Sequence, residues 1–219
     1  MRQRLHPRGS ILVPMSVLPM FPLGSVLFPG GVLPLQVFEE RYRRLVADVR
    51  TGDGRFGVVL IERGSEVGGG DERTAVGTVA KIVREGVAED GRILIVAVGR
   101  ERIRVKEWLG DDPYPRAEVE AIADKDTGNR LAAALARGLA ARRRLLALAV
   151  EMGANGQNLD LDLPDDPLQA SWTLCAAAPL GSFDRQRLLE TEYAYQRMTL
   201  LEQMLAGRHS DLQSVLERG

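Results

Sequence analysis

The sequence predicts an α+β protein in which a mostly antiparallel β domain precedes an α-helical domain. The first half alternates β-branched runs with glycine turns, and its Asp90-Gly91 pair is a strong hairpin signal. The second half begins with a long alanine-, leucine- and arginine-rich stretch at residues 127–151, which is typical of a helix. With 219 residues, 45% of them hydrophobic, the chain is long enough to bury a core in each part.

These patterns place the β domain at residues 15–123 and the helical domain at 124–208. We expect residues 1–14 to form a disordered extension, with Met15 as an alternative start. Arginines followed by Ile11-Leu12-Val13 loosely resemble a signal peptide, but prolines interrupt the apolar run and no small-residue cleavage site follows. Residues 209–219 are expected to be a polar tail.

The β domain opens with a proline-rich apolar segment at residues 18–38. Its four prolines, at positions 19, 22, 29 and 34, exclude a helix and favour short extended pieces. We expect two brief strands joined by a turn at Phe28-Pro29-Gly30-Gly31, where glycine accepts a positive φ.

An amphipathic helix is expected next, over residues 38–49, because apolar side chains recur there at spacings of three and four. Glycines at 52 and 54 end this helix, and the continuous apolar run at 55–62 predicts a buried strand. Residues 64–73 contain three consecutive glycines and are expected to form a mobile loop.

A β meander is predicted from residue 75 to residue 120. Its strands are expected at 76–85, 93–98, 102–108 and 114–121, with the hairpin turn at 89–92. The helical domain follows. After the 127–151 helix, we expect helical segments at 168–178, from an N-cap at Ser182, and from about Glu192 to Leu205.

Several of these segments together resemble the amino-terminal, substrate-binding domain of Lon proteases. The proline-rich opening is followed, in the same order, by Val76-Gly77-Thr78-Val79-Ala80, Glu89-Asp90-Gly91, residues 99–105 and Pro113-Tyr114-Pro115-Arg116. The resemblance spans about residues 17–205. It implies a PUA-like β-barrel domain followed by an α-helical bundle, and a function in polypeptide recognition.

The motifs of Lon catalysis do not occur in this sequence. A Walker phosphate loop needs a lysine directly after a glycine, and none of the lysines follows one. The serine and lysine pair of the Lon protease domain has no counterpart either. We therefore expect no ATPase or protease activity from these residues; a hydrolase label would only be inherited from the family.

Other catalytic and metal-binding chemistries also find little support. Gly52-Asp53-Gly54-Arg55-Phe56-Gly57 fits a dinucleotide fingerprint, but it lies between a helix and a strand in the wrong order. Cys175 lacks an activating base, since the histidines are at positions 6 and 209, and is expected to be a buried structural thiol. The aspartates at 160–166 lack the glycine and terminal glutamate of a calcium loop. We expect no metal and no cofactor.

Composition argues against nucleic acid and membranes as partners. The formal net charge is −1, aromatic residues make up 5% of the chain, and no apolar run is long enough to span a bilayer. A lone cysteine fits a reducing cytoplasm.

We therefore expect a non-catalytic module that binds unfolded or degron-bearing polypeptides, as an adaptor or a chaperone-like protein. A protease or chaperone machine is a candidate partner. The peptide would pair with an open sheet edge or bury apolar side chains in a groove between barrel and helices. Candidate contacts lie near the proline-rich opening and at the end of the meander: Phe28, Leu33, Leu35, Phe38, Tyr42, Trp108 and Tyr114.

Two alternatives remain open from the sequence. PUA-like barrels also occur in RNA-binding proteins, which makes RNA the second candidate ligand. The helical half is a candidate for self-association, as a scaffold or a homodimer, which would require about 1,000 Å² of buried surface.

Overall fold

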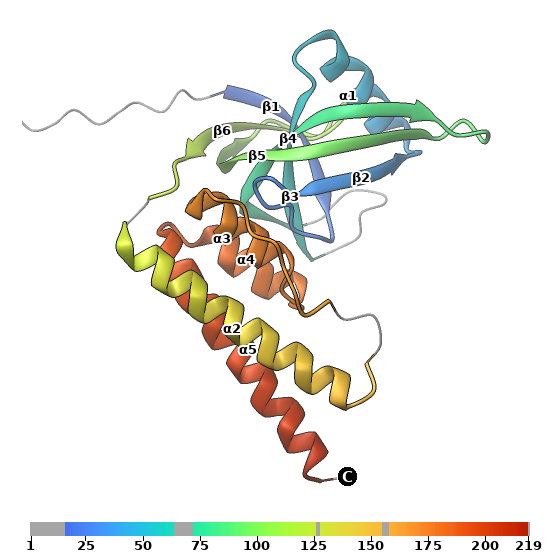
Figure 1. Ribbon diagram of the computed structural model, residues 1–219. Helices are drawn as coiled ribbons and strands as arrows, with labels where there is room; N and C mark the ends of the chain where they lie inside the picture. The colour runs from blue at the N-terminus through green and yellow to red at the C-terminus, as the bar shows by residue number, and fades with distance from the viewer. Residues whose placement is uncertain (1–15, 64–71, 126–127, 155–157, 219) are drawn as a thin grey trace, which may run out of the picture.

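A computed structural model describes residues 16–63, 72–125, 128–154 and 158–218. Within them it confirms an α+β fold, with six strands and five helices. Figure 1 shows the strands gathered in one half of the molecule and helices α2 to α5 layered in the other. The extension expected at 1–14 lies outside the described residues, as does most of the loop expected at 64–73.

The strands form a barrel that is closed along only part of its height. The strands are β1 (Ser16–Leu23), β2 (Val32–Val37), β3 (Arg55–Arg63), β4 (Glu72–Val87), β5 (Ile93–Trp108) and β6 (Arg116–Ile122). Their order is β2-β5-β4-β3-β1-β6, β6 closes that part of the barrel through a further pairing with β5, and β2 is an additional strand beside the open part. All pairings are antiparallel except that of β1 with β3. The second half of β5 pairs with β6, while its first half pairs with β2.

The proline-rich opening forms the two short strands that the sequence predicts. The expected turn is also present, since Gly30 has a φ of 76° and Gly31 donates its N–H to Phe28 O at 2.9 Å. The two strands do not pair with each other. β1 pairs with β3 and β6, whereas β2 pairs with β5.

β5 is one continuous strand, although the sequence predicts two strands separated at residues 99–101. At the predicted break, Gly99 lets the Phe28 segment approach β5, because a Cβ at this position would lie 2.2 Å from Phe28 O. The segment at residues 28–31 and strand β5 therefore approach closely, and Gly99 donates its N–H to Gly31 O at 2.8 Å. β4 and β5 continue beyond the barrel as a hairpin, visible at the right of Figure 1.

Helix α1 (Glu40–Thr51) covers one end of the barrel. Its apolar face buries Tyr42, Leu45, Val46 and Val49, as the spacing of these residues predicts. They pack with Phe56 and other strand residues in one core cluster, while a second cluster, including Met20 and Ile103, fills the barrel interior.

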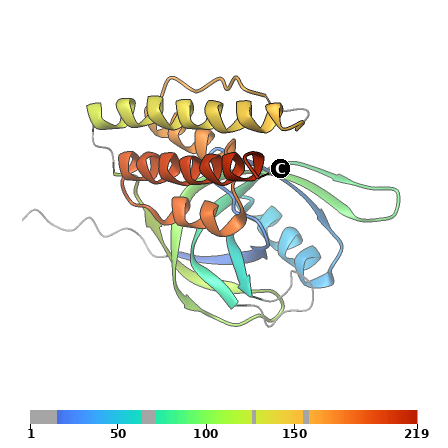
Figure 2. The same ribbon diagram turned by 90° about the horizontal axis from the view of Figure 1, so that it is seen from below.

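The other helices are α2 (Asn129–Glu151), α3 (Pro167–Ala176), α4 (Ser182–Glu190) and α5 (Ala194–Leu216). α2 and α5 lie side by side and run in the same direction (Figures 1 and 2). The core of the helical half contains Trp172 and Cys175, and Cys175 is buried as expected.

Two details of the helical half differ from the predictions. Ser182 is the first helical residue rather than the cap, and its hydroxyl donates to Gly24 O at 2.8 Å. The helix expected to end near Leu205 continues to Leu216, so most of the polar tail expected at 209–219 is helical. Leu212, on this last part of α5, packs against the helical core, which explains the continuation.

Candidate functional site

The barrel is open on one side, between β1 and β2. β2 pairs only with β5 among the described strands, so its other edge is free. β1 pairs with β6 through residues 16–19, and from Phe21 onward its only strand partner is β3. The free edges of β1 and β2 therefore bound a gap, which we call the β1–β2 opening.

An apolar hollow lies in the β1–β2 opening. It has a volume of about 80 Å³ and is lined by Phe21 and Leu23 of β1, by residues 35–37 of β2, and by Phe38, Glu39 and Tyr42. Phe38 follows the last residue of β2 and is 57% exposed, which is unusual for a large aromatic side chain. The hollow is small, and Phe38 forms part of its wall.

Tyr42 forms a rigid wall of the hollow. Its ring stacks on Phe21 with the centroids 4.0 Å apart, and the guanidinium of Arg41 lies 4.5 Å from its centroid. Arg41 also pairs with Glu39 at 3.0 Å. The aromatic stack fixes the shape of the hollow, while the ion pair gives it a polar rim.

Pro34 limits what the free edge of β2 can bind. Alternate residues of a strand direct their N–H groups to opposite edges, and proline has no N–H to donate. Pro34 lies opposite Val96 of β5. Because the Pro34 nitrogen cannot donate a hydrogen bond, it must point away from β5, toward the free edge of β2. A peptide added to this edge would lose one ladder hydrogen bond in its middle.

The structure brings together three of the seven predicted contact residues. Leu35, Phe38 and Tyr42 line the same hollow, and Leu33 lies on β2 near them, partly buried against the core. Phe21 and Leu23 were not predicted as contacts. They belong to the same apolar, proline-rich segment, but the opposition of β1 and β2 depends on their pairing with other strands.

The remaining three predicted contacts lie elsewhere. Phe28 is buried against Trp172, with ring centroids 5.7 Å apart, and forms part of the helical core. Tyr114 is buried, and its hydroxyl donates to Asp48 Oδ2 at 2.6 Å. Trp108 is half-buried, with the guanidinium of Arg73 lying 4.6 Å from its ring centroid. Each of the three has a structural role in the described part of the chain.

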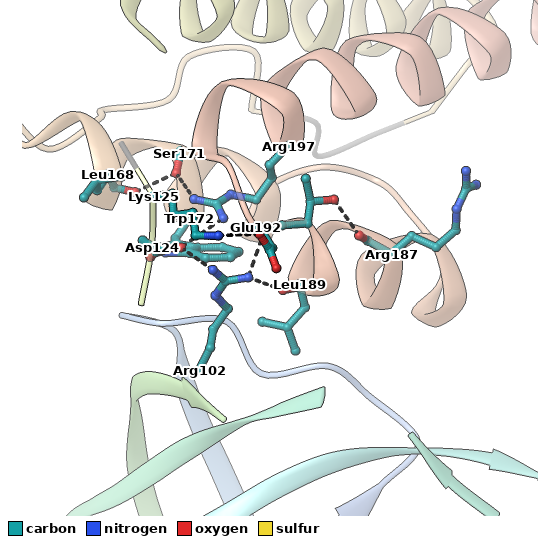
Figure 3. A network of polar contacts seen from close by, with 11 residues as sticks. Arg102, Asp124, Lys125, Leu168, Ser171, Trp172, Arg187, Leu189, Glu192 and Arg197 are labelled. Atoms are coloured by element: carbon teal, nitrogen blue, oxygen red, sulfur yellow. Dashed lines mark hydrogen bonds and ion pairs between the residues drawn. The ribbon is translucent and has the colours of Figure 1, made fainter. Parts of the chain in front are cut away.

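A separate, polar site joins the barrel to the helices (Figure 3). Arg102 of β5 and Arg197 of α5 are both fully buried, and both contact Asp124 Oδ1, at 2.8 and 3.3 Å. Trp172 donates its indole N–H to Asp124 Oδ2 at 2.9 Å. Its ring also lies against both guanidinium groups, 3.3 Å from Arg197 and 5.3 Å from Arg102.

Burial of two arginines at this junction disfavours their charged forms. It lowers the pKa of Arg197 to about 10 and lowers the pKa of Arg102, although the nearby Asp124 opposes both shifts. The Nε atoms of both arginines have no hydrogen-bond partner among the described residues. Arg102 is further held by the carbonyl oxygens of Leu189 and Thr191, at 2.8 and 3.0 Å. The junction fixes the two halves together, and no sequence pattern predicts it.

The described residues contain no cluster that could hold a metal ion, and their cysteine is not activated. None of their histidine, cysteine and acidic side chains gather in a group of three that could hold a metal ion. Cys175 is fully buried, and this burial raises the pKa of its thiol to about 12, so that it is not a nucleophile at neutral pH. No helix in the described ranges is long and apolar enough to span a membrane.

The fold is thus an α+β arrangement in which a β barrel with a side opening is joined to a bundle of helices through Asp124 and two buried arginines. The model of the ATP-dependent protease La (LON) substrate-binding domain matches residues 17–207 of this chain. The chain therefore belongs to the LON substrate-binding domain family, and its fold is that of a substrate-recognition module.

Relatives and solved structures agree with this assignment. The chain is 32% identical to a Lon protease of Cytophaga hutchinsonii over 87% of its own length, and 32% identical to Lon protease 2 of Sorangium cellulosum over 94%. It spans only about a quarter of each of these proteins, 24% in both cases.

The crystal structure of a Lon N-terminal domain protein from Xanthomonas campestris superposes with a TM-score of 0.62 at 29% identity, covering 87% of this chain and 98% of that one. The N-terminal domain of Mycobacterium avium complex Lon protease superposes at 0.61, covering 90% and 99%. At 18% identity, this second match shows the fold alone.

Proposed function

We propose that this protein binds unfolded or degron-bearing polypeptide segments at the β1–β2 opening, without catalysing a reaction on them. The observation that carries the proposal is Phe38, a phenylalanine 57% exposed beside an apolar hollow of about 80 Å³. Membership in a substrate-binding family supports a polypeptide as the ligand.

An apolar side chain of the bound segment would enter the hollow and be covered by Phe38. Burying one such side chain contributes about 1.5–3 kcal/mol, which suits weak and reversible capture of many sequences. Hydrophobic contact is more favourable here than strand addition, because Pro34 interrupts the free edge of β2. Exposed apolar residues are a common property of unfolded chains, so this mode favours them over folded proteins.

Such a binder would act as an adaptor or a chaperone-like protein, delivering segments to a protease or chaperone machine. Its affinity for one apolar residue is low, so useful binding requires several such residues in one chain or several copies of the module.

Titration of the full chain against labelled, unfolded casein at about 0.15 M salt tests the proposal. We expect saturable binding that Phe38→Ala weakens about tenfold, because the hollow loses its cover. Val215→Ala is the matched control, since Val215 is also about half exposed, at 54%, but lies on the last turn of α5.

Three results would contradict the proposal. If Phe38→Ala and Val215→Ala bind casein with equal affinity, the β1–β2 opening is not the binding site. Binding of labelled single-stranded RNA without casein binding would favour the RNA alternative. Binding of neither ligand, together with a stable dimer, would favour a self-associating scaffold.

A further inference from the structure

A second cavity lies between the barrel and helix α4, away from the residues of the β1–β2 opening. It encloses about 470 Å³, within the range of about 300–1,000 Å³ that is typical of ligand pockets. The barrel contributes Glu62 of β3 and residues 73–75 of β4. Helix α4 contributes Phe183, Gln186, Arg187 and Glu190. We call this cavity the α4 cleft.

The two cations that line the α4 cleft are already engaged. Arg73 donates from both terminal nitrogens to Asp111, at 3.0 and 2.6 Å, and its guanidinium lies over the Trp108 ring. Arg187 pairs with Asp184 at 3.6 Å. Neither arginine is therefore left to attract an anionic ligand.

The acceptors of the α4 cleft are not neutralised. Glu62 and Glu190 are exposed, and no described cation lies within ion-pair distance of either carboxylate. Gln186 is 4% exposed and donates its Nε2 to Val76 O at 3.0 Å and to Glu190 Oε1 at 2.8 Å. Its Oε1 is buried without any hydrogen-bond partner among the described residues. A buried acceptor without a donor is costly, and it indicates that a donor is missing from the cleft.

Phe183 adds an aromatic surface to these acceptors. It is 63% exposed and lines the same cavity. The negative face of an aromatic ring attracts cations, most strongly a flat guanidinium that can stack on it. The α4 cleft thus presents two carboxylates without a cationic partner, one amide oxygen without a donor and one exposed ring, all of which favour a cationic donor.

We propose that the α4 cleft binds an arginine side chain of a captured polypeptide. A guanidinium carries five N–H donors in one plane, so it can reach a carboxylate and an amide oxygen together while it stacks on Phe183. This inference rests on the proposed function, to which it adds a preference for segments that contain arginine.

The test compares two labelled nine-residue peptides that differ only at one position, arginine in one and citrulline in the other. Citrulline keeps the shape of arginine but is neutral. We expect the full chain to bind the arginine peptide about tenfold more tightly, the difference typical of a hydrogen bond to a charged group. Glu62→Gln combined with Glu190→Gln is expected to abolish that difference.

Glu151→Gln combined with Glu217→Gln is the control, because it removes the same charge from exposed residues at the far ends of α2 and α5. This control is expected to keep the tenfold preference. Equal binding of the two peptides by the unaltered chain would overturn the inference, as would a preference that persists in the Glu62 and Glu190 variant. Free arginine amide is added as a competitor of the arginine peptide. If it displaces that peptide as effectively as the unlabelled arginine peptide does, the cleft binds arginine itself and not a polypeptide, which would overturn the inference.

Casein binding separates this inference from the proposed function. If the unaltered chain binds casein but does not distinguish the two peptides, only the arginine site is wrong. If it prefers the arginine peptide but Phe38→Ala leaves casein affinity unchanged, the α4 cleft stands and the β1–β2 opening is wrong.

Discussion

The hydroxyl of Tyr114 links the segment before β6 to helix α1, through its 2.6 Å hydrogen bond to Asp48. Burial, together with the hydrogen bond to Asp48 and the charge of that carboxylate, raises the pKa of Tyr114 to about 12. In the unfolded chain a tyrosine has a pKa of about 10. Between these two values the folded state holds a proton that the unfolded state has released, so stability falls as pH rises.

We predict that the free energy of unfolding decreases from pH 9.5 to pH 11.5 and that Tyr114→Phe reduces this decrease. Urea titrations at several pH values measure it. The comparison with Tyr114→Phe is necessary, because the raised pKa of Cys175 also destabilises the protein at high pH. An identical pH dependence of both proteins would contradict the assignment to Tyr114.

Cys175 gives a second prediction at the scale of one residue. Its side chain is fully buried, and its thiol has a raised pKa of about 12, so that both access and thiolate formation are suppressed. A thiol reagent such as dithionitrobenzoate is expected to react with the native protein only through unfolding. The reaction rate should therefore rise steeply with urea. Fast labelling without denaturant would show that the core around α3 opens locally.

At the scale of an element, we predict opposite effects on stability for substitution of two glycines that lie inside helices. Gly138 lies where α2 contacts α3, and a Cβ there would be 3.2 Å from Leu174 Cδ2. Gly207 of α5 has nothing within 4 Å of its Cβ position. We expect Gly138→Val to lower the free energy of unfolding by about 1–3 kcal/mol, because it overpacks the interface.

Gly207→Val is the matched control and is expected to be neutral or slightly stabilising, since valine has the better helix propensity. Thermal and urea unfolding of both variants measure the difference. Equal effects would mean that α2 and α3 separate easily, contrary to the close packing at Gly138.

Elements were predictable from the sequence wherever local chemistry decides them. The apolar spacing of α1, the Asp90-Gly91 hairpin and the glycine break after α2 are all local patterns, and each element appears close to its expected position. The continuity of β5 and the length of α5 were not predictable, because they depend on distant contacts. Gly99 approaches Phe28, and Leu212 packs on the helical core.

The candidate site was predictable only in part for the same reason. Phe38, Leu35 and Tyr42 stand close together in the sequence, so one segment indicated all three. The other side of the β1–β2 opening depends on how β1 and β2 pair with other strands. Phe28 and Tyr114 were buried by elements far along the chain, which no local pattern reveals.

At the scale of the whole molecule, Asp124 holds the barrel and the helices together. It is the carboxylate between two fully buried arginines, Arg102 and Arg197. Removing one partner of a buried ion pair typically costs about 3–5 kcal/mol, because the other charge remains buried. We predict a loss of about this size in the free energy of unfolding for Asp124→Asn.

Asp184→Asn is the control, because Asp184 pairs with Arg187 and Arg208 at partly exposed positions. It should cost less than about 1 kcal/mol. Both values come from urea unfolding followed by circular dichroism and by tryptophan fluorescence. Equal losses in the two variants would show that the junction contributes no more than a surface ion pair.

Arg102 also lies at the carboxyl end of α4. The two carbonyl oxygens that Arg102 contacts, those of Leu189 and Thr191, stand at the carboxyl end of α4. A helix macrodipole places about half a negative elementary charge at that end. Two buried arginines share one aspartate, so the dipole supplies part of the negative charge that is missing. The carboxyl end of α4 thus directs partial negative charge at Arg102, whereas an amino end at the same place would direct partial positive charge at it.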